Sequence, residues 1–113
     1  MPDQSSINIA FIGSGDISLL HADAVHACPA ASLHGLWSID ADLDIKRAQV
    51  FGCKIYDSVE ALVSDPGITA VFILTPLETH TQYATLALEH GKHVLIEKPV
   101  APTLDELHQL KTL

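Results

Sequence analysis

The stretch that decides the fold of this chain is Ile7-Asn8-Ile9-Ala10-Phe11-Ile12-Gly13-Ser14-Gly15-Asp16-Ile17-Ser18. Residues 7–12 form a β-rich apolar run that closes at Gly13. A helical pattern follows over about residues 16–28, where Pro29 stops it. A buried strand that passes through a glycine turn into a helix is typical of the first half of a parallel strand–helix–strand unit.

Outward from this stretch, the same alternation of short apolar runs and helical patterns continues. We expect strands at residues 33–39, 54–56, 70–74 and 93–96, and helices at residues 41–51, 58–63, 79–90 and 103–113. Right-handed crossovers then give an α/β fold with a doubly wound parallel sheet of Rossmann type, in strand order 3-2-1-4-5. No strand follows the last helix, so we expect a sheet truncated before a sixth strand.

Composition and charge exclude several classes of function. The chain has 113 residues, 48% of them hydrophobic, which suits one globular domain. Its formal net charge is −8, and its six Lys and Arg form no run, so binding to nucleic acid is not expected. An acidic chain can still bind a dinucleotide, because backbone N–H groups at a helix N-terminus hold a pyrophosphate without lysine.

Targeting and cysteine signals are weak. No stretch approaches the ~18 apolar residues of a membrane span, and the first six residues lack the pattern of a signal peptide. We therefore expect no membrane association and a cytoplasmic location. Cys28 and Cys53 show no metal or redox spacing, which indicates two reduced, structural thiols.

The glycine loop is the strongest local motif. Gly13 permits a tight turn, and Gly15, which has no Cβ, lets a pyrophosphate approach the backbone. The third small position is Ser18 rather than glycine, which weakens the motif without breaking it. Asp16 would place a charge near the phosphates, so its side chain should point to solvent. The alternative is a plain strand-to-helix turn.

The acidic residue Asp40 ends the second expected strand, 25 residues after Gly15, where an acid is expected after about 20. A carboxylate there accepts hydrogen bonds from adenosine ribose hydroxyls and repels a 2′-phosphate. Asp42 and Asp44 add negative charge, with Arg47 a turn further on. The excess of acidic over basic residues at this position favours NAD over NADP. The alternative is that Asp40 only caps the following helix, and the two roles are compatible.

The fourth and fifth strands also end in distinctive residues, Thr75-Pro76 followed by His80, and Glu97-Lys98-Pro99. With the glycine loop, Asp40 and the run Gly91-Lys92-His93-Val94, they make the chain resemble the N-terminal domain of the Gfo/Idh/MocA family of glucose–fructose oxidoreductase and inositol dehydrogenase. The resemblance runs from about residue 7 to residue 110.

The resemblance implies a role for each matching position. Gly13, Gly15 and Ile17 would line the pyrophosphate beside Asp16, and Asp40 would bind the ribose. Thr75, Pro76 and His80 would border the ribose–phosphate stretch near the nicotinamide. Glu97, Lys98 and Pro99 would lie on the nicotinamide side, with Lys98 as the catalytic lysine. A partly desolvated lysine beside a cationic ring has a lowered pKa, which suits acid–base work. The alternatives are that Lys98 is an exposed lysine after a strand, and that His80 is a histidine in the first turn of a helix without a function.

The resemblance also implies the activity. In this family of NAD(P)-dependent dehydrogenases, hydride moves between nicotinamide and a hydroxyl carbon of a sugar, a polyol or a related compound. Family members continue into a second domain that carries the substrate pocket, so residues 1–113 are expected to be an incomplete dinucleotide-binding domain without full activity of its own. The alternative is a stand-alone nucleotide-binding module or inactive remnant. Apolar surface left uncovered near the fifth strand and the last helix predicts either a homodimer or partial disorder near the C-terminus. No metal site is expected.

Overall fold

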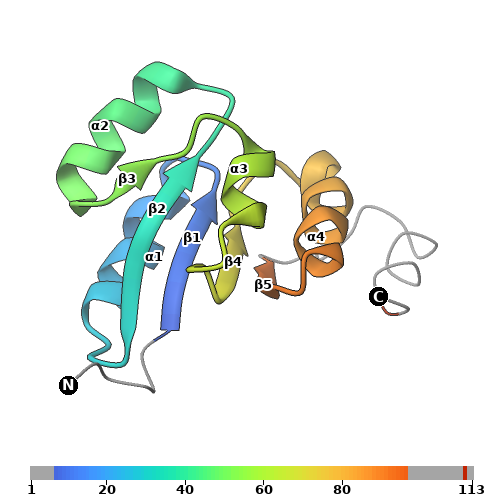
Figure 1. Ribbon diagram of the computed structural model, residues 1–113. Helices are drawn as coiled ribbons and strands as arrows, with labels where there is room; N and C mark the ends of the chain where they lie inside the picture. The colour runs from blue at the N-terminus through green and yellow to red at the C-terminus, as the bar shows by residue number, and fades with distance from the viewer. Residues whose placement is uncertain (1–6, 97–110, 112–113) are drawn as a thin grey trace.

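A computed structural model describes residues 7–96 and 111 of the chain (Figure 1). The elements alternate along the chain: β1 (Ile7–Ile12), α1 (Ile17–His26), β2 (Ala31–Trp37), α2 (Ala41–Phe51), β3 (Lys54–Ile55), α3 (Val59–Ser64), β4 (Ala70–Ile73), a 3₁₀ turn η1 (Leu77–Thr79), α4 (His80–Glu89) and β5 (His93–Ile96).

Within residues 7–96 the sheet has five parallel strands in the order β3-β2-β1-β4-β5, which confirms the expected doubly wound fold. β1 is central and pairs on both sides, with β2 and with β4. The strand order reverses between β1 and β4, and in open α/β sheets ligands bind at such a reversal, beyond the carboxyl ends of the strands.

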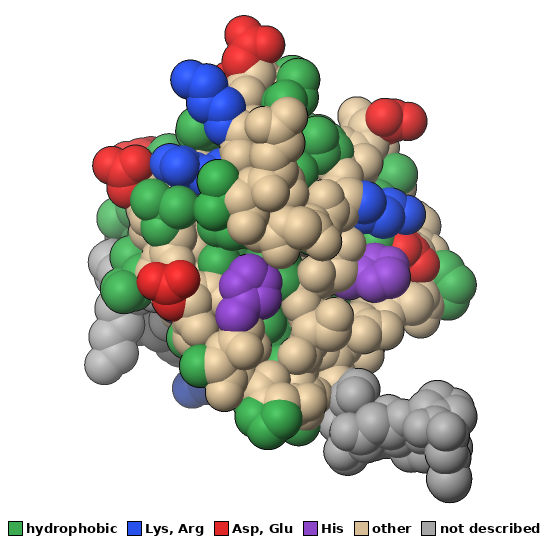
Figure 2. Space-filling view, turned by 90° about the vertical axis from the view of Figure 1, so that its left-hand side faces the viewer, with side chains coloured by type: hydrophobic (Ala, Val, Ile, Leu, Met, Phe, Trp, Pro, Cys, Tyr) green, Lys and Arg blue, Asp and Glu red, His purple; other side chains and the backbone are tan. Residues whose placement is uncertain are grey.

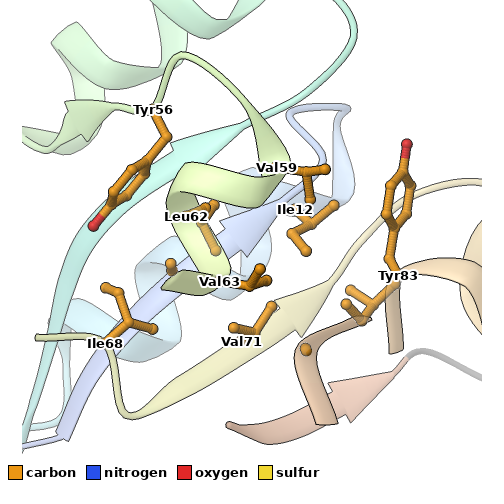
Figure 3. Close-up of a cluster of buried hydrophobic side chains, with 11 residues drawn as sticks. Ile12, Tyr56, Val59, Leu62, Val63, Ile68, Val71 and Tyr83 are labelled. Carbon is orange, nitrogen blue, oxygen red and sulfur yellow. The ribbon is translucent and has the colours of Figure 1, made fainter. Parts of the chain in front are cut away.

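Each face of the sheet carries its own hydrophobic core, because successive side chains of a strand point to opposite faces. Ile9 and Phe11 of β1 belong to the cluster covered by α1 and α2. Ala10 and Ile12 belong to the cluster covered by α3 and α4 (Figure 3). Phe11 and Ile12 have no exposed surface, so the second half of β1 is buried on both faces, as its apolar run over residues 9–12 indicates.

Several expected boundaries differ from the structure by one or two residues, and two of them lie close to the carboxyl ends of strands. The second strand runs over Ala31–Trp37 rather than 33–39, because Ser38 and Asp40 already make the hydrogen bonds that start α2. The fourth helix begins at His80, after the 3₁₀ turn over Leu77–Thr79, instead of at residue 79. Both shifts lie next to the carboxyl end of a strand.

A polar cluster fixes the turn that leads into β4, on the side of the molecule away from those strand ends. Tyr56 Oη donates to Asp65 Oδ2 at 2.5 Å, and Gly67 N donates to Asp65 Oδ1 at 2.8 Å. These hydrogen bonds lower the pKa of Asp65, while burial and the neighbouring carboxylate raise the pKa of Tyr56. Lys92 Nζ donates to the Asp65 and Ile68 carbonyl oxygens at 2.7 Å each. The cluster is therefore a structural one.

Candidate functional site: a cleft at the carboxyl ends of three strands

A cleft of about 250 Å³ opens where β1, β2 and β4 end. The wall is formed by three loops and the helix starts that follow them, and it is mainly apolar. It consists of Gly13, Ser14, Gly15, Trp37, Ser38, Ile39, Asp40, Leu43, Leu74, Thr75, Pro76, Thr79 and Tyr83. We call it the β1–β2–β4 cleft.

The glycine loop, Gly13-Ser14-Gly15, lines one side of this cleft. Gly13 has φ +117°, and a Cβ there would lie 2.6 Å from the Leu74 carbonyl oxygen, so only glycine lets the loop pass this close to β4. A Cβ on Gly15 would meet no described protein atom within 4 Å. The backbone at Gly15 therefore faces open space beside the start of α1, which begins two residues later.

Asp40 lines the cleft and also caps α2. Its Oδ1 accepts a hydrogen bond from Leu43 N at 3.1 Å, so the capping interpretation is confirmed. The residue is exposed, which leaves its second oxygen accessible at the cleft rim. The ribose role stays a prediction.

Behind the glycine loop lies the Asp44 carboxylate, which in the sequence alone counts only as added negative charge near Asp40. Asp44 is 2% exposed and accepts hydrogen bonds from Ser14 Oγ and Ser38 Oγ, both at 2.5 Å. One turn further along α2, Arg47 Nε donates to the Ser14 carbonyl oxygen at 2.9 Å. Arg47 also pairs with Asp16 at 3.2 Å, and that carboxylate is fully exposed, as expected. Side chains of α2 thus bind the glycine loop through Ser14 and Asp16.

At the end of β4, Thr75 and Pro76 line the cleft, whereas His80 does not. His80 is 3% exposed, and its Nε2 donates to the Thr75 carbonyl oxygen at 2.9 Å. Thr79 Oγ1 lies 2.6 Å from Thr75 Oγ1 and donates to the Pro76 carbonyl oxygen at 2.7 Å. In this structure His80 therefore holds the loop that borders the cleft.

An aromatic pair completes the cleft wall. Trp37, the last residue of β2, meets Tyr83 of α4 edge-to-face at 6.0 Å between ring centroids. Figure 3 shows the Tyr83 hydroxyl pointing away from the buried cluster. The Trp37 ring packs against that cluster and also lines the cleft. Its place as the final residue of a strand is the signal that could have indicated the second role.

Other predicted site residues lie elsewhere. Ile17 is the first residue of α1, 38% exposed, and it is not part of the cleft wall. Glu97, Lys98 and Pro99 lie outside the described residues, directly after β5 in the sequence.

The cysteines take no part in the cleft and form no disulfide. Burial raises the pKa of Cys53 to about 11, as suits a structural thiol. Cys28 is exposed, so a structural role is wrong for that residue. Within residues 7–96 and Lys111, no cluster of His, Cys, Asp or Glu is arranged to hold a metal ion. No helix in that same part of the chain has the length and apolar character to cross a membrane.

A doubly wound parallel sheet whose glycine loop opens onto a cleft at the strand-order reversal defines a Rossmann-type dinucleotide-binding domain. Comparison with known families gives the same answer. Residues 7–113 match the oxidoreductase family with an NAD-binding Rossmann fold named GFO_IDH_MocA, and the chain belongs to that family.

Individual relatives agree. The chain is 32% identical over 103 residues to glucose-6-phosphate 3-dehydrogenase of Bacillus subtilis, covering 91% of this chain and 29% of that protein. It is similar in structure to an NAD-binding protein from Listeria innocua, with a TM-score of 0.89 and 34% identity over 95% of this chain and 32% of the other. Biliverdin reductase from Synechocystis, solved with biliverdin and NADP+, gives a TM-score of 0.89 and 29% identity over 94% of this chain and 34% of that chain. The chain therefore spans about a third of the length of these proteins.

Proposed function

We propose that the β1–β2–β4 cleft binds NAD(H), and that the chain supplies the cofactor-binding part of an oxidoreductase acting on a hydroxyl carbon of a sugar, a polyol or a related compound. The observation that carries the proposal is the glycine loop at the start of α1, open at Gly15 and facing the same cleft as Asp40. The family membership and the sugar-phosphate dehydrogenase relative support the class of reaction.

The residues present fit a dinucleotide. Backbone N–H groups of residues 15–17, at the start of α1, would bind the pyrophosphate, since the first N–H groups of a helix lack intrahelical acceptors. The second oxygen of Asp40 would accept a ribose hydroxyl. The apolar wall around Trp37, Leu43 and Pro76 would enclose flat ring surface and exclude water. The bound cofactor supplies the hydride chemistry.

NAD rather than NADP is the proposed cofactor because the side chains at the end of β2 do not suit a 2′-phosphate. Ile39, 88% exposed, and the Asp40 carboxylate offer nothing to a 2′-phosphate. The nearby cation, Arg47, is already bonded to the glycine loop and to Asp16. Among the described residues that line this cleft there is no Lys or Arg, so a phosphate at the end of β2 would meet the Asp40 carboxylate without a cationic partner there.

Titration with NADH and NADPH tests the proposal. Trp37 is the single tryptophan of the chain and lines the cleft, so its fluorescence should be quenched as either cofactor binds. We expect tighter binding of NADH, and a preference that shrinks roughly tenfold in Asp40→Ala, since one hydrogen bond to a charged group and one like-charge repulsion are lost.

The control for this titration is Asp23→Ala, which removes an exposed acid of α1 that does not line the cleft and should leave the preference unchanged. Equal affinity of the wild-type chain for both cofactors would refute the role given to Asp40. Absence of binding by either cofactor would refute the proposed function itself.

Lys98 is the proposed catalytic lysine. In the protein that contains the complete substrate pocket, Lys98→Met should lower kcat by at least roughly 100-fold, because acid–base catalysis by a placed side chain contributes about that much. NADH affinity, measured through Trp37, should change little. Turnover that survives the substitution would remove Lys98 from the mechanism. A chain that binds NADH tightly and shows no turnover in any context would favour the alternative of a stand-alone binding module.

A further inference from the structure

The most unusual group outside the predicted site is the buried carboxylate of Asp44. It lies in the first turn of α2, with 2% of its surface exposed, where a charge is costly unless it is fully hydrogen-bonded. It is so bonded: Oδ1 accepts from Ser14 Oγ and Ser38 Oγ, and Oδ2 accepts from Ser38 N at 3.0 Å. The carboxylate thus joins the glycine loop after β1 to the residue that follows β2.

This arrangement fixes the direction of the Ser38 hydroxyl, which belongs to the cleft wall. The hydroxyl proton is drawn to Asp44 Oδ1 at 2.5 Å, since the other acceptor within reach, the Asp40 carbonyl oxygen, is 3.3 Å away and uncharged. One lone pair of Ser38 Oγ accepts from Asp40 N at 3.1 Å. A hydroxyl oxygen has two lone pairs, so what remains for a ligand is one acceptor position and no donor.

We infer that Asp44 is a specificity-determining positioning residue that makes Ser38 an obligate hydrogen-bond acceptor and so selects a cofactor with a free ribose hydroxyl over one with a 2′-phosphate. The inference rests on the proposed function, because it assigns the ribose end of the dinucleotide to the end of β2. A ribose hydroxyl donates and is accepted by Ser38. A phosphate oxygen only accepts, so it gains no hydrogen bond from the Ser38 hydroxyl, and it would lie near the buried negative charge of Asp44.

Asp44 acts through Ser38 and does not line the cleft itself. Its second partner, Ser14, is 2% exposed and lies between Gly13 and Gly15. The same carboxylate therefore also holds the glycine loop in position. Arg47 holds the carbonyl group of that serine from the same face of α2. The charge on Asp44 therefore couples the two loops that receive the pyrophosphate and the ribose.

The test compares Asp44→Asn with Asp42→Asn in the 113-residue chain, by Trp37 fluorescence with NADH and with NADPH. An asparagine keeps the shape but its amide nitrogen is a donor, which frees the Ser38 proton to point into the cleft. We expect the ratio of NADPH to NADH dissociation constants to fall about tenfold, mainly through tighter NADPH binding, because one charge-assisted hydrogen bond is gained. Asp42→Asn removes the same charge from an exposed position in the same turn and should leave the ratio within about twofold of wild type.

Ser38→Ala is the second variant, and it tests the acceptor role of Ser38 if Asp44→Asn does not fold. It should weaken NADH binding and leave NADPH binding unchanged, since only the acceptor for the ribose hydroxyl is lost. A folded Asp44→Asn with the wild-type ratio, or a Ser38→Ala that binds NADH as tightly as wild type, would overturn the inference while the proposed function stands. A wild-type chain that binds neither cofactor would overturn both.

Discussion

Gly15→Ala is expected to abolish tight NADH binding while leaving the fold intact. A Cβ at this position meets no described protein atom within 4 Å, and the backbone φ is not in the left-handed region, so the folded chain accommodates the methyl group. The same methyl group would occupy the space through which the pyrophosphate reaches the backbone. We expect NADH affinity to fall by at least roughly 100-fold, about 2.7 kcal/mol, in the Trp37 titration.

Stability measured on the same variant separates binding from folding. Gly15→Ala should raise the free energy of unfolding slightly, by about 0.5 kcal/mol, because alanine restricts the unfolded chain more than glycine does. Gly91→Ala, at the end of α4 and outside the cleft, should show the opposite pattern: lower stability from its φ of +75° and unchanged NADH binding. Normal NADH affinity in Gly15→Ala would mean that the pyrophosphate does not lie on this loop.

Much of the fold could be predicted because its signals are local. The mostly apolar run of β1, the glycine turn after it and the helical pattern of α1 are contiguous, and the order of strands follows from the handedness of each crossover. The positions of Gly13, Gly15 and Asp40 on one cleft follow in turn, since parallel strands end at the same edge of the sheet.

The rest of the site depends on contacts between segments far apart in the sequence. Nothing local in the sequence marks Asp44 as buried, so there it counts only as added negative charge. It is buried because α2 packs against the loop of Ser14, 30 residues earlier. Trp37 at the end of β2 meets Tyr83 of α4, a contact between two segments far apart in the sequence. His80 has the sequence features of a ligand-facing histidine, yet it turns inward to the Thr75 carbonyl group.

The charges of the surface also could not be interpreted from the sequence alone. On the side that α1 and α2 cover, basic side chains are interspersed with acidic ones (Figure 2). Arg47 shows what this means for cofactor choice: a cation within reach of the cleft loops is already neutralised by Asp16 and bonded to Ser14. Its presence in the sequence near the ribose acid does not by itself favour a 2′-phosphate.

Gly13→Ala is expected to produce the largest loss of stability of any single change in the loop. The added Cβ would lie 2.6 Å from the Leu74 carbonyl oxygen and 2.7 Å from its carbonyl carbon, both backbone atoms that cannot rotate away. The φ of +117° is also one that alanine rarely adopts. Backbone strain and overpacking together should cost on the order of 4 kcal/mol, against a total stability of about 5–15 kcal/mol for a domain.

Urea unfolding followed by circular dichroism measures this loss, and Gly52→Ala is the matched control. Gly52 has φ +71° at the end of α2, with nothing within 4 Å of an added Cβ, so it should lose only about 1–2 kcal/mol from backbone strain. The difference between the two variants isolates the close approach of the glycine loop to β4. Equal losses in the two variants would show that Gly13 tolerates a side chain, and that the loop and the end of β4 are further apart in solution than the structure has them.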